Sequence, residues 1–355
     1  MTVGPSSLKV ETLQKLNRAG ANNFRINLSH STKESLKVYF DIFSKAKIKP
    51  SIDTQGAQIR VESLPGGSNF NEGEEVLICF GKNKNNENLE KNSKKERMII
   101  MNHPEVINQI SKGDLLKVDF EGLSIEMITL TENKDSWIGR VVTSGKVIVN
   151  RAVDIHGKSV QLSALTEFDK YAIEEAMMNG CKEVYASFVN RADDIRYIRG
   201  VIDNDIKLIS KIESAEAVGN ADEIVRLSDA ILIDRGDLSR EISIPAIPIA
   251  VKSIIQIAEK YRKEVYIATN ILDSMMTNSL PSRAEISDIY TLLDAGVDGL
   301  VLAAEVAIGK HPVESTALVE YLMRLYENHK QGLHGISYIK KPDRNLIGEK
   351  LYHWI

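Results

Sequence analysis

Short apolar runs alternate with amphipathic segments over most of the chain. Residues 23–28 and 48–53 are typical of β-strands, and the segment between them carries apolar residues at helical spacing. Helical segments also separate five later strand-like runs, at residues 183–187, 206–212, 230–234, 265–269 and 299–303. Capping-box patterns at 166–169 and 282–285 predict two helix starts. This alternation is the signature of βα units and a parallel sheet.

The alternation stops in the middle of the chain. From about residue 63 to 161, apolar strand-like runs are separated by turns rich in glycine, which indicates an inserted, mainly β domain. Outside it, seven clear strands and a very short eighth at residues 2–3 favour a (β/α)₈ barrel. The rival doubly wound sheet would typically carry a phosphate loop, and neither G-x-G-x-x-G nor G-x-x-x-x-G-K-[ST] is present. The predicted fold is therefore an α/β TIM barrel with an inserted β-barrel-like domain.

These patterns also predict the division of the chain. The expected parts are a first barrel segment, the β-rich insertion, a second barrel segment and a C-terminal tail, at residues 1–62, 63–161, 162–330 and 331–355. Inside the insertion, residues 82–97 form a polar, basic stretch that we interpret as a solvated loop without an assigned function.

Composition narrows the class of partner. The 355 residues are 43% hydrophobic and 26% charged, with 45 Lys+Arg against 49 Asp+Glu and a net charge of −4. Such a balance argues against a nucleic-acid partner. Two cysteines give no basis for a disulfide framework, and no apolar run or leader pattern indicates a membrane partner or export. We therefore expect a cytoplasmic protein.

Polar residues stand where the predicted strands end, which is where barrel enzymes carry out their chemistry. Lys211 and Glu213 end one strand, and Asp237 follows the next. Two carboxylates on adjacent strand ends are suited to Mg²⁺, and a lysine two residues before a carboxylate on a strand points to the same side. This arrangement would let a cation and a metal face one anionic substrate.

Each of these residues also has a purely structural interpretation. Lys211 and Glu213 could form an ion pair at the barrel rim, and residues 235–237 could form a plain turn. The Thr269 hydroxyl could simply make hydrogen bonds within the barrel. His30 is equally compatible with a structural hydrogen bond. A further group offers side-chain oxygens suited to a monovalent cation: Asn27, Ser29, Asp53 and Thr54.

Seven segments together resemble the signature segments of the pyruvate kinase family, in the family's order and spacing. They are residues 25–30 (RINLSH), 53–60 (DTQGAQIR), 209–213 (ISKIE), 234–238 (DRGDL), 268–275 (ATNILDSM), 281–285 (PSRAE) and 309–312 (GKHP). The resemblance runs from about residue 4 to 326 and includes an insertion where the family has its lid domain. It also implies that the family's C-terminal regulatory domain is missing.

The resemblance implies a glycolytic phosphotransferase that transfers the phosphoryl group of phosphoenolpyruvate to ADP, giving pyruvate and ATP, with Mg²⁺ (or Mn²⁺) and K⁺. It implies Glu213 and Asp237 as Mg²⁺ ligands, Lys211 and Arg25 as partners of the phosphoryl group, and Gly236, Asp237 and Thr269 at the pyruvate end. Lys211, Thr269 and Arg25 are the implied catalytic residues. The implied K⁺ ligands are Asn27, Ser29, Asp53 and Thr54; the implied nucleotide contacts are Asn27, Ser29, His30 and Arg60. A homo-oligomer is compatible with the family.

The sequence also departs from the family pattern, chiefly on the nucleotide side. The family's usual Lys and Pro-Glu appear as Gln55 and Ala57-Gln58, and its Ser-Gly-Glu-Thr as residues 303–306, AAEV. Two alternatives therefore stay open. One is a Mg²⁺-dependent lyase or condensing enzyme acting on another phosphoenol or 2-oxo acid, and the other is a non-catalytic barrel that binds a partner.

Overall fold

The computed structural model describes residues 1–81, 97–118, 122–156, 158, 160–332 and 340–355. They separate into two compact units: residues 1–55 with 167–355, and residues 56–166. The predicted polar stretch at 82–97 lies outside the described residues, except for Arg97.

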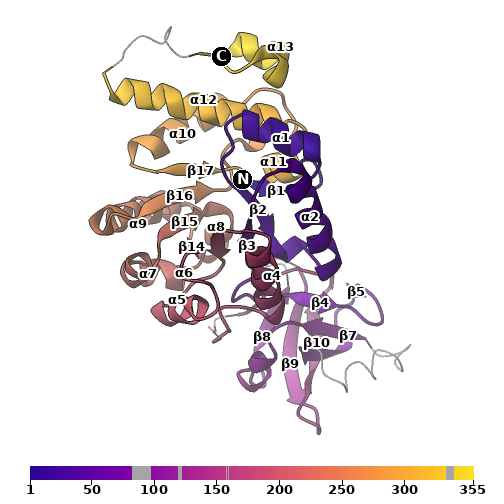
Figure 1. Cartoon of the computed structure of the whole chain (residues 1–355). Helices are drawn as coiled ribbons and strands as arrows, with labels where there is room; N and C mark the ends of the chain where they lie inside the picture. The colour runs from indigo at the N-terminus through magenta and orange to yellow at the C-terminus, as the bar shows by residue number, and fades with distance from the viewer. Residues whose placement is uncertain (82–96, 119–121, 157, 159, 333–339) are drawn as a thin grey trace. The chain divides into compact units, whose positions relative to one another are not determined.

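The first unit is an eight-stranded parallel barrel (Figure 1). Its strands, in spatial order, are β1 (Thr2–Val3), β2 (Phe24–Asn27), β3 (Pro50–Asp53), β13 (Glu183–Ala186), β14 (Lys207–Ile212), β15 (Ala230–Asp234), β16 (Glu264–Ala268) and β17 (Gly299–Val301). The ring closes where the Thr2 N–H donates to the Leu302 carbonyl over 2.8 Å. The predicted (β/α)₈ barrel is confirmed, including its two-residue first strand.

Helices follow the strands along the barrel. They are α1 (Val10–Arg18), α2 (Lys33–Ala46), α4 (Glu167–Met178), α5 (Ala192–Arg199), α6 (Ala215–Gly219), α7 (Ala221–Leu227), α8 (Arg235–Glu241), α9 (Ile247–Tyr261), α10 (Arg283–Asp294), α11 (Ala304–Ala307), α12 (Pro312–Lys330) and α13 (Arg344–Trp354), with short 3₁₀ turns η1 (Leu28–His30), η3 (Ile244–Ala246) and η4 (Asp273–Met276). A further 3₁₀ turn, η2 (Pro104–Asn108), belongs to the second unit. The capping box predicted at 282–285 is present: Ser282 and Glu285 bond each other's backbone N–H.

The strand alternation decides which side chains enter the barrel. Apolar residues on alternate positions of neighbouring strands form a buried cluster inside it: Tyr185, Ile209, Ala230, Leu232, Ala268 and Val301. Because the period of a strand is two, the next inward positions on β14 and β15 are Lys211 and Asp234. The apolar layer therefore ends where a charged layer begins, at the carboxyl ends of the strands.

The second unit is a small β-barrel. Its main sheet has the order β12 (Val153–Ile155), β8 (Leu115–Val118), β9 (Ser124–Leu130), β10 (Ser136–Thr143), β6 (Glu75–Phe80), β7 (Met98–Met101) and β4 (Val61–Ser63); β5 (Asn69–Phe70) and β11 (Gly145–Lys146) pair separately. The residues before the two edge strands join in a bridge, Arg60 with Ala152, which closes the sheet on itself. The interior is apolar, with Ile78, Ile99 and Ile125 fully buried.

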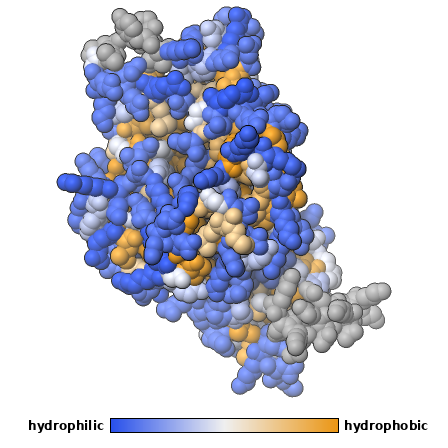
Figure 2. Space-filling model, viewed as in Figure 1, coloured by the Kyte–Doolittle hydropathy of each residue, from blue (hydrophilic) through white to orange (hydrophobic). Residues whose placement is uncertain are grey.

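Hydrophilic residues make up most of the face drawn in Figure 2. Among the described residues, no helix combines the length and apolar character needed to cross a membrane.

Candidate functional site

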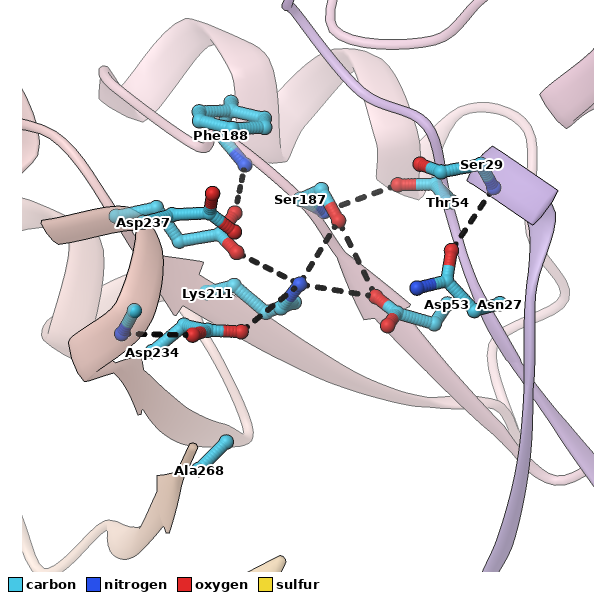
Figure 3. A network of polar contacts seen from close by, with 12 residues as sticks. Asn27, Ser29, Asp53, Thr54, Ser187, Phe188, Lys211, Asp234, Asp237 and Ala268 are labelled. Atoms are coloured by element: carbon cyan, nitrogen blue, oxygen red, sulfur yellow. Dashed lines mark hydrogen bonds and ion pairs between the residues drawn. The ribbon is translucent and has the colours of Figure 1, made fainter. Parts of the chain in front are cut away.

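Lys211 lies at the centre of a charged network at the carboxyl ends of the barrel strands (Figure 3). Its Nζ is 2.7 Å from Glu213 Oε1, 3.2 Å from Asp53 Oδ1 and 3.6 Å from Asp234 Oδ2. It also donates to the Ser187 hydroxyl over 3.2 Å. Only 6% of the Lys211 side chain is exposed, so the barrel holds this ammonium group out of water.

The backbone and neighbouring hydroxyls hold the three carboxylates in place. The Phe188 N–H donates to Glu213 Oε2 over 2.8 Å, and the Ser187 hydroxyl donates to Asp53 Oδ1 over 3.2 Å. Asp234 lies at the start of α8, and its Oδ1 accepts the Gly236 N–H over 3.2 Å. These bonds orient the acidic groups toward Lys211 before any ligand arrives.

The charges of this network do not balance. Its buried members are two cations, Lys211 and Arg25, and three carboxylates, Asp53, Glu213 and Asp234. Burial alone would lower the pKa of Lys211, but these three carboxylates outweigh it and hold that pKa above its ordinary value. Burial raises the pKa of Glu213, and the nearby carboxylates of Asp237 and Asp234 raise it further against the opposing effect of Lys211. This raised pKa lets Glu213 hold a proton, and a further cation bound among the carboxylates would replace that proton.

Three carboxylates fit a hard metal ion. Glu213, Asp234 and Asp237 each offer one oxygen, and these oxygens lie within 4.8 Å of one another. Glu213 Oε1 is buried, and Lys211 Nζ lies 2.7 Å from it. Three converging carboxylate oxygens are the kind of ligand set that is suited to Mg²⁺ or Mn²⁺. Sequence reasoning named Glu213 and Asp237 as ligands and missed Asp234.

Gly236 and Thr269 meet beside this acidic group. The Gly236 N–H donates to Thr269 Oγ1 over 2.7 Å, and Thr269 Oγ1 lies 2.9 Å from Asp234 Oδ1. A Cβ on residue 236 would come within 3.2 Å of Thr269 Cγ2. The structure therefore brings Gly236 and Thr269, two of the three residues predicted for the pyruvate end, into direct contact with the charged network.

Arg25 lies deeper in the barrel than a surface phosphate contact would. Its side chain is 3% exposed; Nε is 3.3 Å from Asp53 Oδ2, and Nη2 donates to Thr2 Oγ1 over 2.8 Å. The guanidinium carbon is 5.2 Å from the centre of the Tyr185 ring. Nη1 is buried and has no hydrogen-bond partner among the described residues. Arg25 thus joins the network through Asp53.

The residues predicted for K⁺ lie on two adjacent strand ends. Asn27 on β2 is in register with Asp53 on β3. The Asn27 side-chain oxygen accepts the Ser29 N–H over 2.8 Å, and Thr54 Oγ1 accepts the Ser187 N–H over 2.9 Å. Figure 3 shows Asn27, Ser29, Asp53 and Thr54 together on one side of Lys211.

The two remaining nucleotide candidates have different locations. His30 ends η1 and is exposed beside this group. Arg60 belongs to the inserted unit, where its Nη1 donates to the Asn150 carbonyl over 3.0 Å. The structure thus unites all the predicted site residues of the barrel unit at its strand ends.

Ser187 and Phe188 are, besides Asp234, the residues of this network that sequence reasoning missed. Ser187 links Asp53, Thr54 and Lys211, and Phe188 has a left-handed backbone, with φ 52°, that presents its N–H to Glu213. Both follow β13, so the strand-end rule that found Lys211 could also have found Ser187. A backbone N–H has no sequence signal, and Phe188 could not have been found in that way.

The fold and the site define a (β/α)₈ protein with a candidate metal and anion site at the carboxyl ends of its strands. The chain matches the family described as "Pyruvate kinase, barrel domain" over residues 1–316. It belongs to the pyruvate kinase family.

Similar proteins come from several groups of organisms. The chain is 32% identical to a pyruvate kinase of Sporosarcina psychrophila and 31% identical to one of Debaryomyces hansenii; each alignment covers 90% of this chain and 55% and 64% of the relative, respectively. It is 31% identical to plastidial pyruvate kinase 2 of Arabidopsis thaliana, over 90% of this chain and 55% of that protein. The chain thus spans a little over half to just under two thirds of the length of these relatives.

Proposed function

We propose that the chain transfers the phosphoryl group of phosphoenolpyruvate to ADP, producing pyruvate and ATP. The observation that carries this proposal is the buried Lys211 ammonium, held by three carboxylates next to Gly236 and Thr269. Phosphoryl transfer needs charge neutralisation and alignment more than covalent chemistry by the protein, and a buried cation beside a metal site supplies both.

In this proposal Lys211 neutralises the charge of the phosphoryl group during its transfer. The bond between phosphorus and the enol oxygen breaks, and a new bond forms between phosphorus and a terminal oxygen of ADP. Arg25 adds positive charge through its position beside Asp53. The Gly236 and Thr269 region binds the pyruvate end, and the Thr269 hydroxyl directs a water that protonates the enolate carbon. Glu213 and Asp237, with Asp234 close by, would hold Mg²⁺ or Mn²⁺, which supplies Lewis-acid stabilisation of phosphate and enolate oxygens when bound.

The other expectations belong to the same proposal. Asn27, Ser29, Asp53 and Thr54 would hold K⁺, while Asn27, Ser29, His30 and Arg60 would contact the nucleotide phosphates. A cytoplasmic location, a place in glycolysis and assembly as a homo-oligomer stay predictions.

The decisive experiment measures pyruvate release from phosphoenolpyruvate with ADP, Mg²⁺ and K⁺, omitting each in turn. We expect release to require ADP and Mg²⁺, to stop on addition of EDTA and to resume when Mg²⁺ is restored in excess. Release without ADP would favour the alternative of a different reaction on a phosphoenol acid. Binding of phosphoenolpyruvate without any release would favour a non-catalytic barrel.

A further inference from the structure

The loop that follows β16 has an unusual backbone. Thr269 and Asn270 are consecutive and both left-handed, with φ values of 67° and 54°. Residues other than glycine rarely adopt this conformation, which is least favourable for a β-branched residue such as threonine. Strained backbone of this kind persists only where surrounding contacts hold it, and it is concentrated at functional sites.

Arg235 holds the first half of this loop. Its Nη2 donates to the Thr269 carbonyl over 3.0 Å and to the Asn270 carbonyl over 2.9 Å, and its Nε lies 3.3 Å from the Thr269 carbonyl. Asp288 on α10 fixes the other end of the guanidinium, accepting from Nη1 over 2.8 Å. Only a planar, forked cation can make all these bonds together.

Glu305 holds the second half. Its Oε1 accepts the N–H groups of Ile271 and Leu272 over 3.2 and 3.1 Å, and its Oε2 accepts the Ala303 N–H over 2.9 Å. The side chain is 2% exposed. Two charged side chains, one after β15 and one after β17, therefore satisfy the backbone of four successive residues after β16.

We propose that Arg235 and Glu305 are positioning residues that hold Thr269 in its left-handed conformation. In this conformation Thr269 Oγ1 accepts the Gly236 N–H and faces Asp234. The inference rests on the proposed function, because it assigns these two residues to the pyruvate end of that site. Arg235 acts through Thr269 and needs no contact with substrate, since its donors already serve the loop and Asp288.

A double-mutant cycle tests this coupling. The variants are Arg235→Lys, which keeps the charge but loses the fork, Thr269→Ala, and the two combined. We expect Arg235→Lys to lower kcat for pyruvate release about 10- to 100-fold, because small displacements of a positioned group have effects of this size. In the Thr269→Ala background, Arg235→Lys should lower kcat less than about threefold. An equal loss in both backgrounds would overturn the proposal.

A second readout isolates the pyruvate end. Exchange of the pyruvate methyl protons in D₂O with Mg²⁺, without nucleotide, should slow in Arg235→Lys and Glu305→Gln, while the KM for ADP changes less than about twofold. Asp288→Asn, which loosens Arg235 without removing it, should give a smaller effect in the same direction. Matched controls are Arg196→Lys and Glu167→Gln, whose side chains form exposed ion pairs on α5 and α4. Equal slowing in the controls, or none in either positioning variant, would contradict the proposal.

Amide hydrogen exchange separates this inference from the proposed function. The Gly236, Ile271 and Leu272 amides should exchange at least about tenfold faster in Arg235→Lys and Glu305→Gln than in the controls. If the wild-type protein releases no pyruvate, the proposed function has failed, and faster exchange still shows that these side chains hold the loop. Unchanged exchange would overturn the inference whatever the activity.

Discussion

Strand β14 carries a lysine at each end of the barrel, and the two lysines have opposite surroundings. Lys211, at the carboxyl end, is 6% exposed and faces Asp53, Glu213 and Asp234. Lys207, at the amino end, is 30% exposed and pairs with Glu264, while its Nζ donates to the Tyr266 hydroxyl over 2.8 Å. The same residue type on the same strand thus meets a buried acidic cluster at one end and a half-exposed partner at the other.

This difference distinguishes the candidate site from a structural ion pair. At the amino end the Tyr266 hydroxyl also donates to Glu264 over 2.6 Å, so charge and hydrogen bonds are satisfied within reach of solvent. Exposed pairs of this kind contribute about 0–1 kcal/mol to stability. At the carboxyl end the carboxylates outnumber the buried cations, and such unbalanced, desolvated charge is typical of sites that bind ions or anionic ligands.

A cavity at the opposite end of the barrel is a rival location for a ligand site. A cavity of about 440 Å³ lies at the amino ends, lined in part by Glu183, Tyr185, Glu264 and Tyr266. A pocket lined by polar groups is a common first hypothesis for a ligand site. We propose the other end for the chemistry because the left-handed Thr269 and the convergent carboxylates lie there, at the strand ends where barrel enzymes have their active sites.

The largest expected effect tests the two lysines directly. Lys211→Met should lower kcat for pyruvate release by at least about 10³-fold, because the transferring phosphoryl group loses its fixed counter-charge. It should also lower the metal-free free energy of unfolding by about 3–5 kcal/mol, since it leaves buried carboxylates without their cation. The matched variant Lys207→Met should keep kcat within about twofold. Steady-state kinetics measure kcat, and urea unfolding measures the free energy of unfolding. Similar losses of activity in the two variants would contradict our assignment of different roles to the two ends of the barrel.

Substitution of two glycines, one at each end of the barrel, should have effects of intermediate size. In Gly236→Ala the new methyl group would contact Thr269 at 3.2–3.3 Å where the pyruvate end is proposed to bind. We expect kcat/KM for phosphoenolpyruvate to fall about 10- to 100-fold, the effect of one added methyl group in a fitted site. In Gly299→Ala the methyl group would lie 2.9 Å from the Tyr266 ring, which must shift. That variant should lose about 1–3 kcal/mol of unfolding free energy while its folded fraction keeps near-normal activity. The reverse pattern would contradict our placement of the site.

The smallest effect concerns acid stability at the amino end. Hydrogen bonds from Lys207 and then Tyr266 hold the pKa of Glu264 below its ordinary value of 4.5. A carboxylate with a lowered folded-state pKa stabilises the protein above its unfolded pKa, and this contribution disappears as pH falls through the folded value. Glu264→Gln should therefore flatten the loss of stability on acidification below about pH 4.5, by a modest amount because the group is half exposed. Urea unfolding across this range measures it; an unchanged pH slope would show that Glu264 is not the group responsible.

Local patterns predicted much of this protein. Strand alternation placed Lys211 and Glu213 on one side of β14, and the capping box at 282–285 marked where α10 begins. Hydrogen bonds within four residues and a side-chain period of two are properties of short segments. For that reason the barrel, its short first strand and the strand-end position of the site could be predicted before any packing was known.

Other features had no local signal. The contacts of Arg25 with Thr2 and Asp53, the Phe188 N–H that bonds Glu213 and the Glu305 carboxylate that bonds the loop after β16 all join segments distant in the chain. The family resemblance implies Arg25 as a contact of the substrate phosphate, and this stays a prediction; its burial and its partners in the structure depend on neighbouring strands.

By itself, the sequence determined which residues of β14, β15 and β16 enter the barrel and at which end they lie, because strand periodicity and chain order suffice for that. Only the tertiary structure decided that Lys211 contacts Asp53, Glu213 and Asp234 together, and that Thr269 is held left-handed. Charge balance, desolvation and backbone strain depend on groups brought together from separate strands, and no single segment of the chain contains them.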